Sequence, residues 1–191
     1  MPGRPRDPDL EKRLLSAAWS LLTSHGYDAL TLARVAVEAR AYRTDVYRRW
    51  SSKARLVTDV LDEYLPPVAD LNTGSLYGDL RAFVENLATV WAAPWIDGLT
   101  GLLADLRHDP EADAAYRSMI QRRDQPLVNA IARAVRRGEI REVPELALVG
   151  NVLEGPLMHR RVVGRQAVTP EFFDAVALSA HCLITGTTVL R

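Results

Sequence analysis

Apolar side chains recur at helical spacing along almost the whole chain, and proline-containing pairs divide them into separate segments. The first apolar face carries Leu10, Leu14, Ala17 and Leu21. This three-to-four-residue period is that of an amphipathic helix. Later segments open on Asp109-Pro110 and Thr169-Pro170, a capping residue followed by the proline that suits a first helical turn. Because no strand-like alternation or hairpin turn interrupts the pattern, we predict an all-α fold.

The positions of capping and helix-breaking residues predict about nine helices. Their expected ranges are roughly 8–25, 32–39, 43–50, 53–65, 75–92, 95–107, 110–137, 144–163 and 170–183. We divide the chain into a head, residues 1–55, and a body, residues 56–191, with the stretch 66–74 as the candidate boundary segment. The length of 191 residues suits one large domain or a small one joined to a medium one.

The two parts carry opposite charge although the formal net charge of the chain is zero. The head has 11 Lys and Arg against 6 Asp and Glu, a net +5, and the body has 13 against 18, a net −5. Such asymmetry points to a polyanion-binding end. The acidic body is repelled by phosphate, which favours an approach with the head first.

Within the head, two short predicted helices flank the tight connection Arg40-Ala41-Tyr42. This is a helix-turn-helix pattern, in which the second helix enters the major groove of DNA. Arg suits guanine and Asp suits cytosine N4, while Tyr, Lys and Thr side chains reach phosphates. Val46 and Trp50 face inward and are expected in the core. The predicted DNA contacts are Arg4, Arg6, Thr31, Tyr42, Arg43, Thr44, Asp45, Tyr47, Arg48, Arg49 and Lys53.

Residues 10–57 resemble the DNA-binding domain of the TetR (tetracycline-repressor-like) family of bacterial regulators. The matching stretches are Leu14-Leu15-Ser16-Ala17-Ala18, Gly26-Tyr27-Asp28-Ala29-Leu30-Thr31-Leu32, Val35-Ala36 and Val46-Tyr47-Arg48-Arg49-Trp50-Ser51-Ser52-Lys53-Ala54-Arg55-Leu56-Val57, and the leading Gly3-Arg4-Pro5-Arg6 is also common in that family. The stretch from Val46 to Val57 is similar to the family's LYxxFxSKxxLL passage, with Trp50 in place of Phe. More loosely, segments from Arg137 to Phe172 resemble a C-terminal domain common in this family.

The chain departs from that family pattern at three positions around the turn. Arg40 stands where the family usually has glycine, which adopts a left-handed backbone without strain. Tyr42 stands where a small capping residue is common, and Asp45 replaces a residue that is often Thr. A carboxylate at that place repels phosphate unless it reads a base or pairs with Arg49. These departures leave the class intact and put individual base contacts in question.

The resemblance implies a body that dimerises through its last two long helices and binds a small molecule. The predicted dimer contacts are Leu153, Leu157, Phe173, Val176, Ala180 and Leu183; the alternative is burial within one protomer. The predicted ligand pocket, for an apolar or aromatic effector, is lined by Phe83, Trp91, Trp95, Tyr116, Met119 and Met158. The alternative for these side chains is an ordinary helical core. Cys182 reads as a packing residue.

Other function classes find little support in the sequence. The four His residues are scattered, no metal-ligand spacing, phosphate-binding glycine loop or nucleophile elbow is present, and we expect neither an enzyme nor a cofactor or metal. No apolar run approaches the roughly 20 residues that span a bilayer. The single cysteine and the absence of a secretory signal predict a cytoplasmic protein without membrane partners.

The sequence thus predicts a homodimeric transcriptional regulator, a repressor that binds a palindromic double-stranded DNA operator and is released by its effector. The alternative is a helical small-molecule-binding or scaffold protein without specific DNA binding, which the departures at Arg40, Tyr42 and Asp45 keep open.

Overall fold

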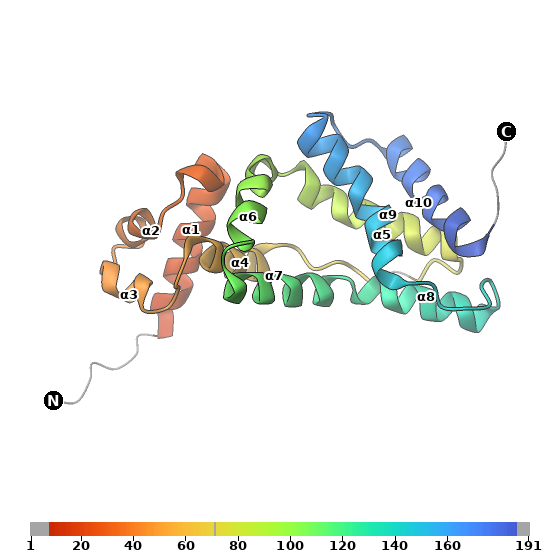
Figure 1. Ribbon diagram of the computed structural model, residues 1–191, viewed down its shortest axis with the longest axis horizontal. Helices are drawn as coiled ribbons and strands as arrows, with labels where there is room; N and C mark the ends of the chain where they lie inside the picture. The colour runs from red at the N-terminus through yellow and green to blue at the C-terminus, as the bar shows by residue number, and fades with distance from the viewer. Residues whose placement is uncertain (1–7, 71, 187–191) are drawn as a thin grey trace. The chain divides into compact units, whose positions relative to one another are not determined.

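The computed structural model describes residues 8–70 and 72–186, and every regular element in that part of the chain is helical, as predicted (Figure 1). The chain forms two compact units. The first joins Met1–Leu65 to Asp97–Met119, and the second joins Pro66–Ile96 to Ile120–Arg191. The first stretch of the first unit ends at Leu65 and not at residue 55, because the helix α4 packs against α1.

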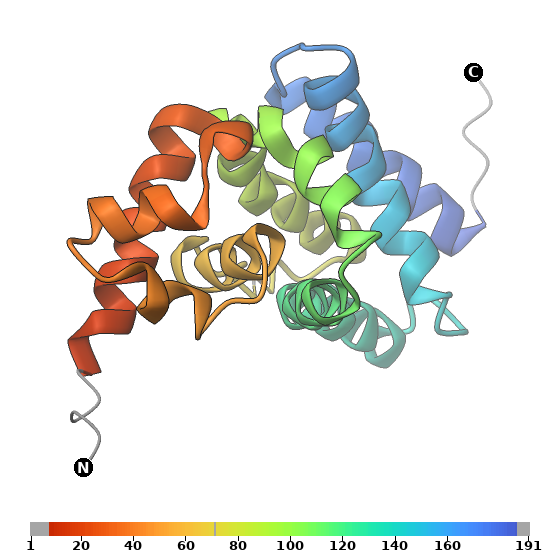
Figure 2. The ribbon, with the colours of Figure 1, turned by 60° about the vertical axis from the view of Figure 1, so that its left-hand side comes forward.

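The first unit contains α1 (Pro8–Ala29), α2 (Leu32–Glu38), α3 (Arg43–Tyr47), α4 (Lys53–Tyr64) and α6 (Leu99–Leu106). Figure 2 shows α2 and α3 beside α1. Side chains from all of these helices meet in one apolar core, including Leu14, Leu22, Val35, Val46, Leu56, Leu61 and Leu102. Val46 and Trp50, which are 0% and 3% exposed, belong to this core as predicted.

Polar caps fix where these helices begin. The Thr31 hydroxyl accepts a hydrogen bond from the Arg34 amide at 3.2 Å, and the Ser52 hydroxyl accepts one from the Arg55 amide at 3.0 Å. Each satisfies an amide that the first helical turn leaves without a partner. At the other end of α1, Gly26 has φ 78°, ψ 173° and breaks the helix where the sequence predicted its end.

The second unit is built on α5 (Leu76–Ala92), α8 (Gln125–Arg137), α9 (Leu146–Met158) and α10 (Pro170–Thr185). In this unit α10 packs against both α5 and α9, and α5 packs against α8 (Figure 1). Phe83, Leu87, Ile131, Leu153 and Phe173 are among the buried side chains. A π-helical turn, η2 (His159–Val163), continues α9 toward the loop before α10.

Three predicted helices are subdivided. The helix expected over 110–137 is two helices, α7 (Pro110–Arg123) and α8, because Pro126 lacks an amide and suits only the start of a helix. The helix expected over 95–107 begins as a 3-10 turn, η1 (Pro94–Gly98), before α6, and the one expected over 144–163 ends as η2.

No single helix within the described ranges is long and apolar enough to cross a membrane. Only α5 and the stretch Pro94–Leu106, taken together as a bent pair, meet the requirements of length and composition.

Candidate nucleic-acid interface

The α2–turn–α3 pair is held from the inside and presents its polar side outward. Val35, Ala36 and Val46 are at most 1% exposed and anchor the two helices. Behind them, the indole Nε1 of Trp50 donates to the Asp59 carboxylate at 2.9 Å. In the turn, the Ala41 amide donates to the Ala36 carbonyl at 2.9 Å. The short helix α3 is therefore fixed by packing, which leaves its outer side chains available.

The outer surface of α3 and its N-cap carries four of the predicted DNA contacts. Tyr42 is 71% exposed and Tyr47 is 55% exposed, and Arg43 and Thr44 are also exposed. The Arg43 guanidinium has no hydrogen-bond or ion-pair partner among residues 8–70 and 72–186. An unpaired guanidinium at the start of a recognition helix is the group best suited to guanine. Tyr42 makes no side-chain cap, as its size predicts.

Asp45 is paired with the two arginines that directly follow α3. Its Oδ1 lies 2.9 Å from a guanidinium nitrogen of Arg48 and 4.0 Å from one of Arg49, and Arg49 also donates to the Asp45 carbonyl at 2.9 Å. The pairing removes much of the repulsion that a lone carboxylate would exert on phosphate. It also occupies Arg49, which is half-buried, whereas the Arg48 side chain remains 69% exposed.

The turn residue Arg40 adopts φ 50°, the left-handed region in which the family uses glycine. A side chain in that region costs about 1–2 kcal/mol. The sequence left open whether Arg40 strains the turn or changes it, and the structure keeps the turn with Arg40 left-handed.

Lys53 has partners inside the protein that the sequence did not reveal. Its Nζ lies 3.9 Å from Asp105 Oδ2 and 3.9 Å from the ring centre of Tyr27. The Tyr27 hydroxyl in turn donates to Asp105 Oδ2 at 2.6 Å. Asp105 stabilises the Lys53 cation at the start of α4 without a phosphate partner, so a phosphate contact by Lys53 stays a prediction.

The remaining predicted DNA contacts are Thr31, Arg4 and Arg6. The Thr31 oxygen serves as the cap of α2, which leaves its O–H free to donate outward. Arg4 and Arg6 lie outside the described residues.

The predicted ligand residues are distributed over both units. Phe83, Trp91 and Trp95 are buried in the second unit, and Met119 is buried and Tyr116 half-buried in the first. Met158 is 40% exposed on α9. Its place in the wall of a ligand pocket stays a prediction.

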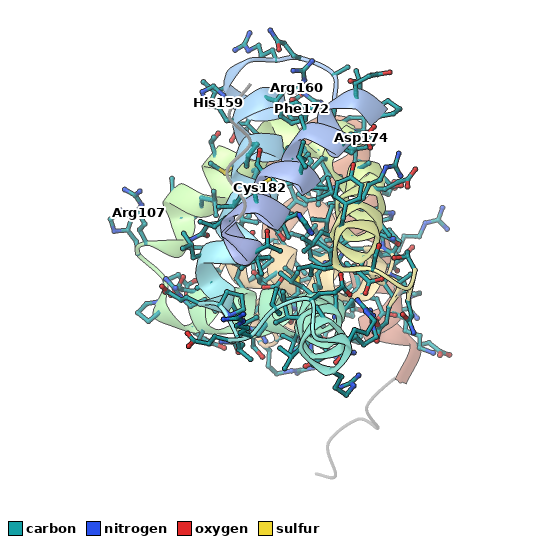
Figure 3. The ribbon with its side chains drawn as sticks, turned by 90° about the vertical axis from the view of Figure 1, so that its right-hand side faces the viewer. Arg107, His159, Arg160, Phe172, Asp174 and Cys182 are labelled. Atoms are coloured by element: carbon teal, nitrogen blue, oxygen red, sulfur yellow. The ribbon has the colours of Figure 1, made fainter. Side chains whose placement is uncertain are left out.

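For five of the six predicted dimer contacts, burial favours the alternative, packing within one protomer. Leu153, Leu157 and Ala180 have no exposed surface, and Val176 and Phe173 have 4% and 6%. Leu183 is 48% exposed and remains available. Cys182, half-buried on α10, lies on the side of the unit that Figure 3 presents.

Two polar features of the second unit escaped the sequence analysis. The Trp95 indole N–H is buried with no acceptor among the described residues, an unusual state for a buried donor. Burial and, to a smaller extent, the nearby Asp124 carboxylate raise the pKa of Glu154 on α9 to about 7, although Arg123 opposes the shift. Near neutral pH, Glu154 therefore exists in both charged and protonated forms.

In the first unit, the sequence did not reveal three carboxylates that lie close to the segment Ser51–Arg55. They are Asp105 on α6, Asp109 just before α7 and Glu111 on α7. No short-range pattern in the sequence could have found them, because about fifty residues separate the two stretches.

Family models match both parts of the chain. Residues 14–60 match the description "Bacterial regulatory proteins, tetR family", and residues 70–179 match "Tetracyclin repressor-like, C-terminal domain". The second match alone spans more than half of the 191 residues.

Similar proteins are regulators. The uncharacterized HTH-type transcriptional regulator Rv1556 of Mycobacterium tuberculosis is 31% identical over 91% of this chain and 88% of its own length. A DNA-binding transcriptional repressor TetR of Mycobacteroides abscessus is 33% identical over 79% of this chain and 81% of its own. Among solved structures, the TetR family transcription regulator SCO0332 superposes with a TM-score of 0.71 at 25% identity, covering 94% of this chain and 99% of that one. The chain thus belongs to the tetR family of bacterial transcriptional regulators, proteins with a helix-turn-helix DNA-binding domain rather than enzymes.

Proposed function

We propose that the protein is a homodimeric transcriptional repressor that binds a palindromic DNA operator through α2 and α3 and leaves it when a small apolar or aromatic effector binds the second unit. The observation that carries the proposal is the outer surface of α3, where Arg43, Thr44 and Tyr47 are exposed over a fixed apolar core. A rigid scaffold with exposed base-reading and phosphate-binding groups is what groove recognition needs.

A second copy is supported by an apolar stripe on α9 and α10, here called the α9–α10 stripe. Its members are exposed or half-exposed and are apolar or small: Leu148, Gly155, Met158, Ala175, Leu178 and Leu183. Leu148, Gly155 and Met158 on α9 and Ala175 and Leu178 on α10 are spaced by three or seven residues, which places each set on one helix face, whereas Leu183 lies farther round α10. A side chain at Gly155 would meet nothing within 4 Å. Isolated exposed apolar residues are ordinary, but an aligned set of them favours burial against a partner. A dimer with two-fold symmetry matches a palindromic site.

An effector site is supported by the composition of the second unit. Phe83, Trp91 and Trp95 gather aromatic surface in its interior, and the Trp95 indole N–H offers a donor without an acceptor. Ligand sites in helical proteins combine apolar walls with a few polar groups of this kind. We propose an apolar or aromatic effector that carries a hydrogen-bond acceptor for Trp95.

Release by an effector requires two conformations that bind the effector unequally. An effector lowers DNA affinity only if it binds the DNA-free conformation more tightly than the DNA-bound one. The helix α7 is continuous across the boundary between the two units, which falls after Met119, so both units contain part of the same helix. The 33% identity to a protein named as a DNA-binding repressor supports repression over activation.

The experiment that tests the dimer and DNA binding together is the substitution Leu178→Asp. Two symmetry-related carboxylates placed in an apolar contact each cost at least about 1.4 kcal/mol, so the dimer dissociation constant should rise by about 100-fold or more. Sedimentation measures that constant, and a mobility shift with DNA from upstream of the gene should weaken in parallel.

The matched control is Val143→Asp, which places the same charge on an apolar side chain that is 62% exposed and lies off the stripe. It should leave both measurements unchanged. A Leu178→Asp variant that remains fully dimeric would remove the α9–α10 stripe from the proposed interface.

A further inference from the structure

Three carboxylates at the junction of α6 and α7 contact successive donors of the segment Ser51–Arg55. Asp105 Oδ2 lies 3.9 Å from the Lys53 ammonium, and Glu111 accepts a hydrogen bond from the Ser51 hydroxyl at 3.1 Å. Between them, the neighbouring Ser52 hydroxyl lowers the pKa of the Asp109 carboxyl. Glu111 also lies 3.6 Å from Arg55 Nε. This set of contacts, here called the acidic clamp, joins residues far apart in sequence within one compact unit.

The donors in the clamp are those that phosphate prefers. Hydroxyls, an ammonium and a guanidinium near the start of a helix make up a typical backbone-binding set on DNA. Carboxylate oxygens resemble phosphate oxygens in charge and in accepting charge-assisted hydrogen bonds. The segment therefore already holds anionic acceptors where DNA would supply others.

The contacts are positioned by firm packing yet remain open to exchange. Tyr27, which is 2% exposed, holds Asp105 through its hydroxyl, and Asp109 caps α7 by accepting from the Ala112 amide at 3.0 Å. The carboxylate side chains of Asp105 and Glu111 are themselves 51% and 68% exposed. A surface cleft of about 600 Å³ is lined on one side by residues 51–54 and on the other by the three carboxylates, together with His108 and Pro110. Solvent and an incoming anion can reach these groups from the cleft.

We propose that Asp105, Asp109 and Glu111 are positioning residues that stand in for phosphate: they hold the donors of Ser51–Arg55 in the DNA-free protein, and DNA phosphates displace them on binding. The inference rests on the proposed DNA-binding function. Opening the acidic clamp then costs free energy, which lowers the net affinity for DNA. A movement of α7, which carries Glu111 and follows Asp109, would change that free-energy cost.

The test compares Asp105→Asn and Glu111→Gln with Asp113→Asn in the full-length protein. Each change removes one negative charge and keeps the side-chain shape; Asp113 lies on α7 but pairs with Arg117 instead of the segment. The probe is a fluorescein-labelled, mixed-sequence duplex of about 30 base pairs, long enough for two half-sites. Anisotropy titrations between about 50 and 200 mM salt give both affinity and its salt dependence.

Both clamp variants should bind the duplex about two- to five-fold more tightly per protomer than the wild type, the range expected for an exposed ion pair. Their salt dependence should keep the wild-type slope, because the same cations contact phosphate in both complexes. Asp113→Asn should change neither quantity. In a Lys53→Ala background, Asp105→Asn should have no further effect, because the pair that it opens no longer exists. Melting temperatures within a few degrees of wild type establish that each variant is folded.

Equal changes in DNA affinity for Asp105→Asn and Asp113→Asn would overturn the inference, because the loss of any one negative charge would then explain both. The proposed DNA-binding function would still stand. Weaker binding by both clamp variants would also overturn it, since the carboxylates would then support the bound state. If neither wild type nor any variant binds the duplex at low salt, the inference and the proposed function fall together.

Discussion

Replacing Asp79 by Ala is expected to destabilise the protein by about 3–5 kcal/mol, the cost of removing one partner from a buried ionic network. The Asp79 side chain is fully buried at the start of α5. Its Oδ1 accepts from the Thr73 amide at 2.7 Å and the Thr73 hydroxyl at 2.8 Å. Its Oδ2 lies 3.4 Å from both Arg133 and Arg137 on α8. Without the carboxylate, two guanidinium groups lose their shared counter-charge in the interior of the second unit.

Urea unfolding measures this loss, with Asp70→Ala as the control. Asp70 contacts the same Arg133 at 2.7 Å but is exposed, so its removal should cost less than about 1 kcal/mol. A loss below about 1 kcal/mol for Asp79→Ala would show that the network does not stabilise the fold.

The effect of Asp79 should also depend on pH. Burial alone raises the pKa of the carboxyl, but hydrogen bonds from Thr73 and the charge of Arg133 outweigh it and hold the pKa below the ordinary value of 3.8. A carboxyl with a depressed folded pKa contributes its full stability above the unfolded value, and that contribution disappears as the pH falls through the folded one. The difference between wild type and Asp79→Ala should therefore be constant near neutral pH and shrink below about pH 4.

The second large effect is expected at Arg43. Replacing it by Ala should relax the preference at one base pair in each half-site by about 1–3 kcal/mol, so a dimer loses about 2–6 kcal/mol of discrimination. The reason is that Arg43 is exposed at the start of α3 and has no partner within the described part of the chain that would compete with a base. Binding to a panel of operator variants, each with one base pair changed, measures the preference.

Arg43→Lys separates base reading from charge. Lysine keeps the charge and hence the salt dependence, but it lacks the two-pronged geometry that guanine requires. The salt slope should stay at the wild-type value while the base preference falls. Base preference that survives in Arg43→Ala would limit Arg43 to backbone contacts.

Local sequence signals predicted most of the helices because caps and breakers act over a few residues. Thr31 and Ser52 cap α2 and α4, Gly26 interrupts α1, and Pro66 and Pro67 follow the end of α4. The missed break between α7 and α8 has the same origin: Pro126 is a local signal, but the apolar period continues across it and favoured one long helix.

The sequence could not separate a core face from an interface face on α9 and α10. Both faces are apolar, and only the packing against α5 shows that Leu153 and Val176 point inward while Leu148 and Leu178 remain exposed. Helical periodicity gives the spacing of apolar positions but not which neighbour covers them.

The sequence predicted which helix carries the candidate DNA contacts, but it did not predict the hydrogen-bond and ion-pair partners of the individual side chains. The resemblance located the recognition helix, and the structure leaves its outer side chains exposed. The partners of Lys53 and Ser51 come from Asp105 and Glu111 through the tertiary fold, which no local pattern encodes. The zero net charge likewise hides a basic head, in which part of the positive charge is matched by carboxylates of the body.

The most direct test of the central claim, that a dimer of this chain reads DNA through α3, is a hydroxyl-radical footprint of the full-length protein on the DNA upstream of its gene. The account predicts two protected stretches related by two-fold symmetry, with centres separated by one or more helical turns of about 10.5 base pairs. It also predicts that Arg43→Ala weakens this sequence-specific protection while sequence-independent binding persists. An intact dimer that protects no sequence at low salt would contradict the account and favour a helical small-molecule-binding or scaffold protein.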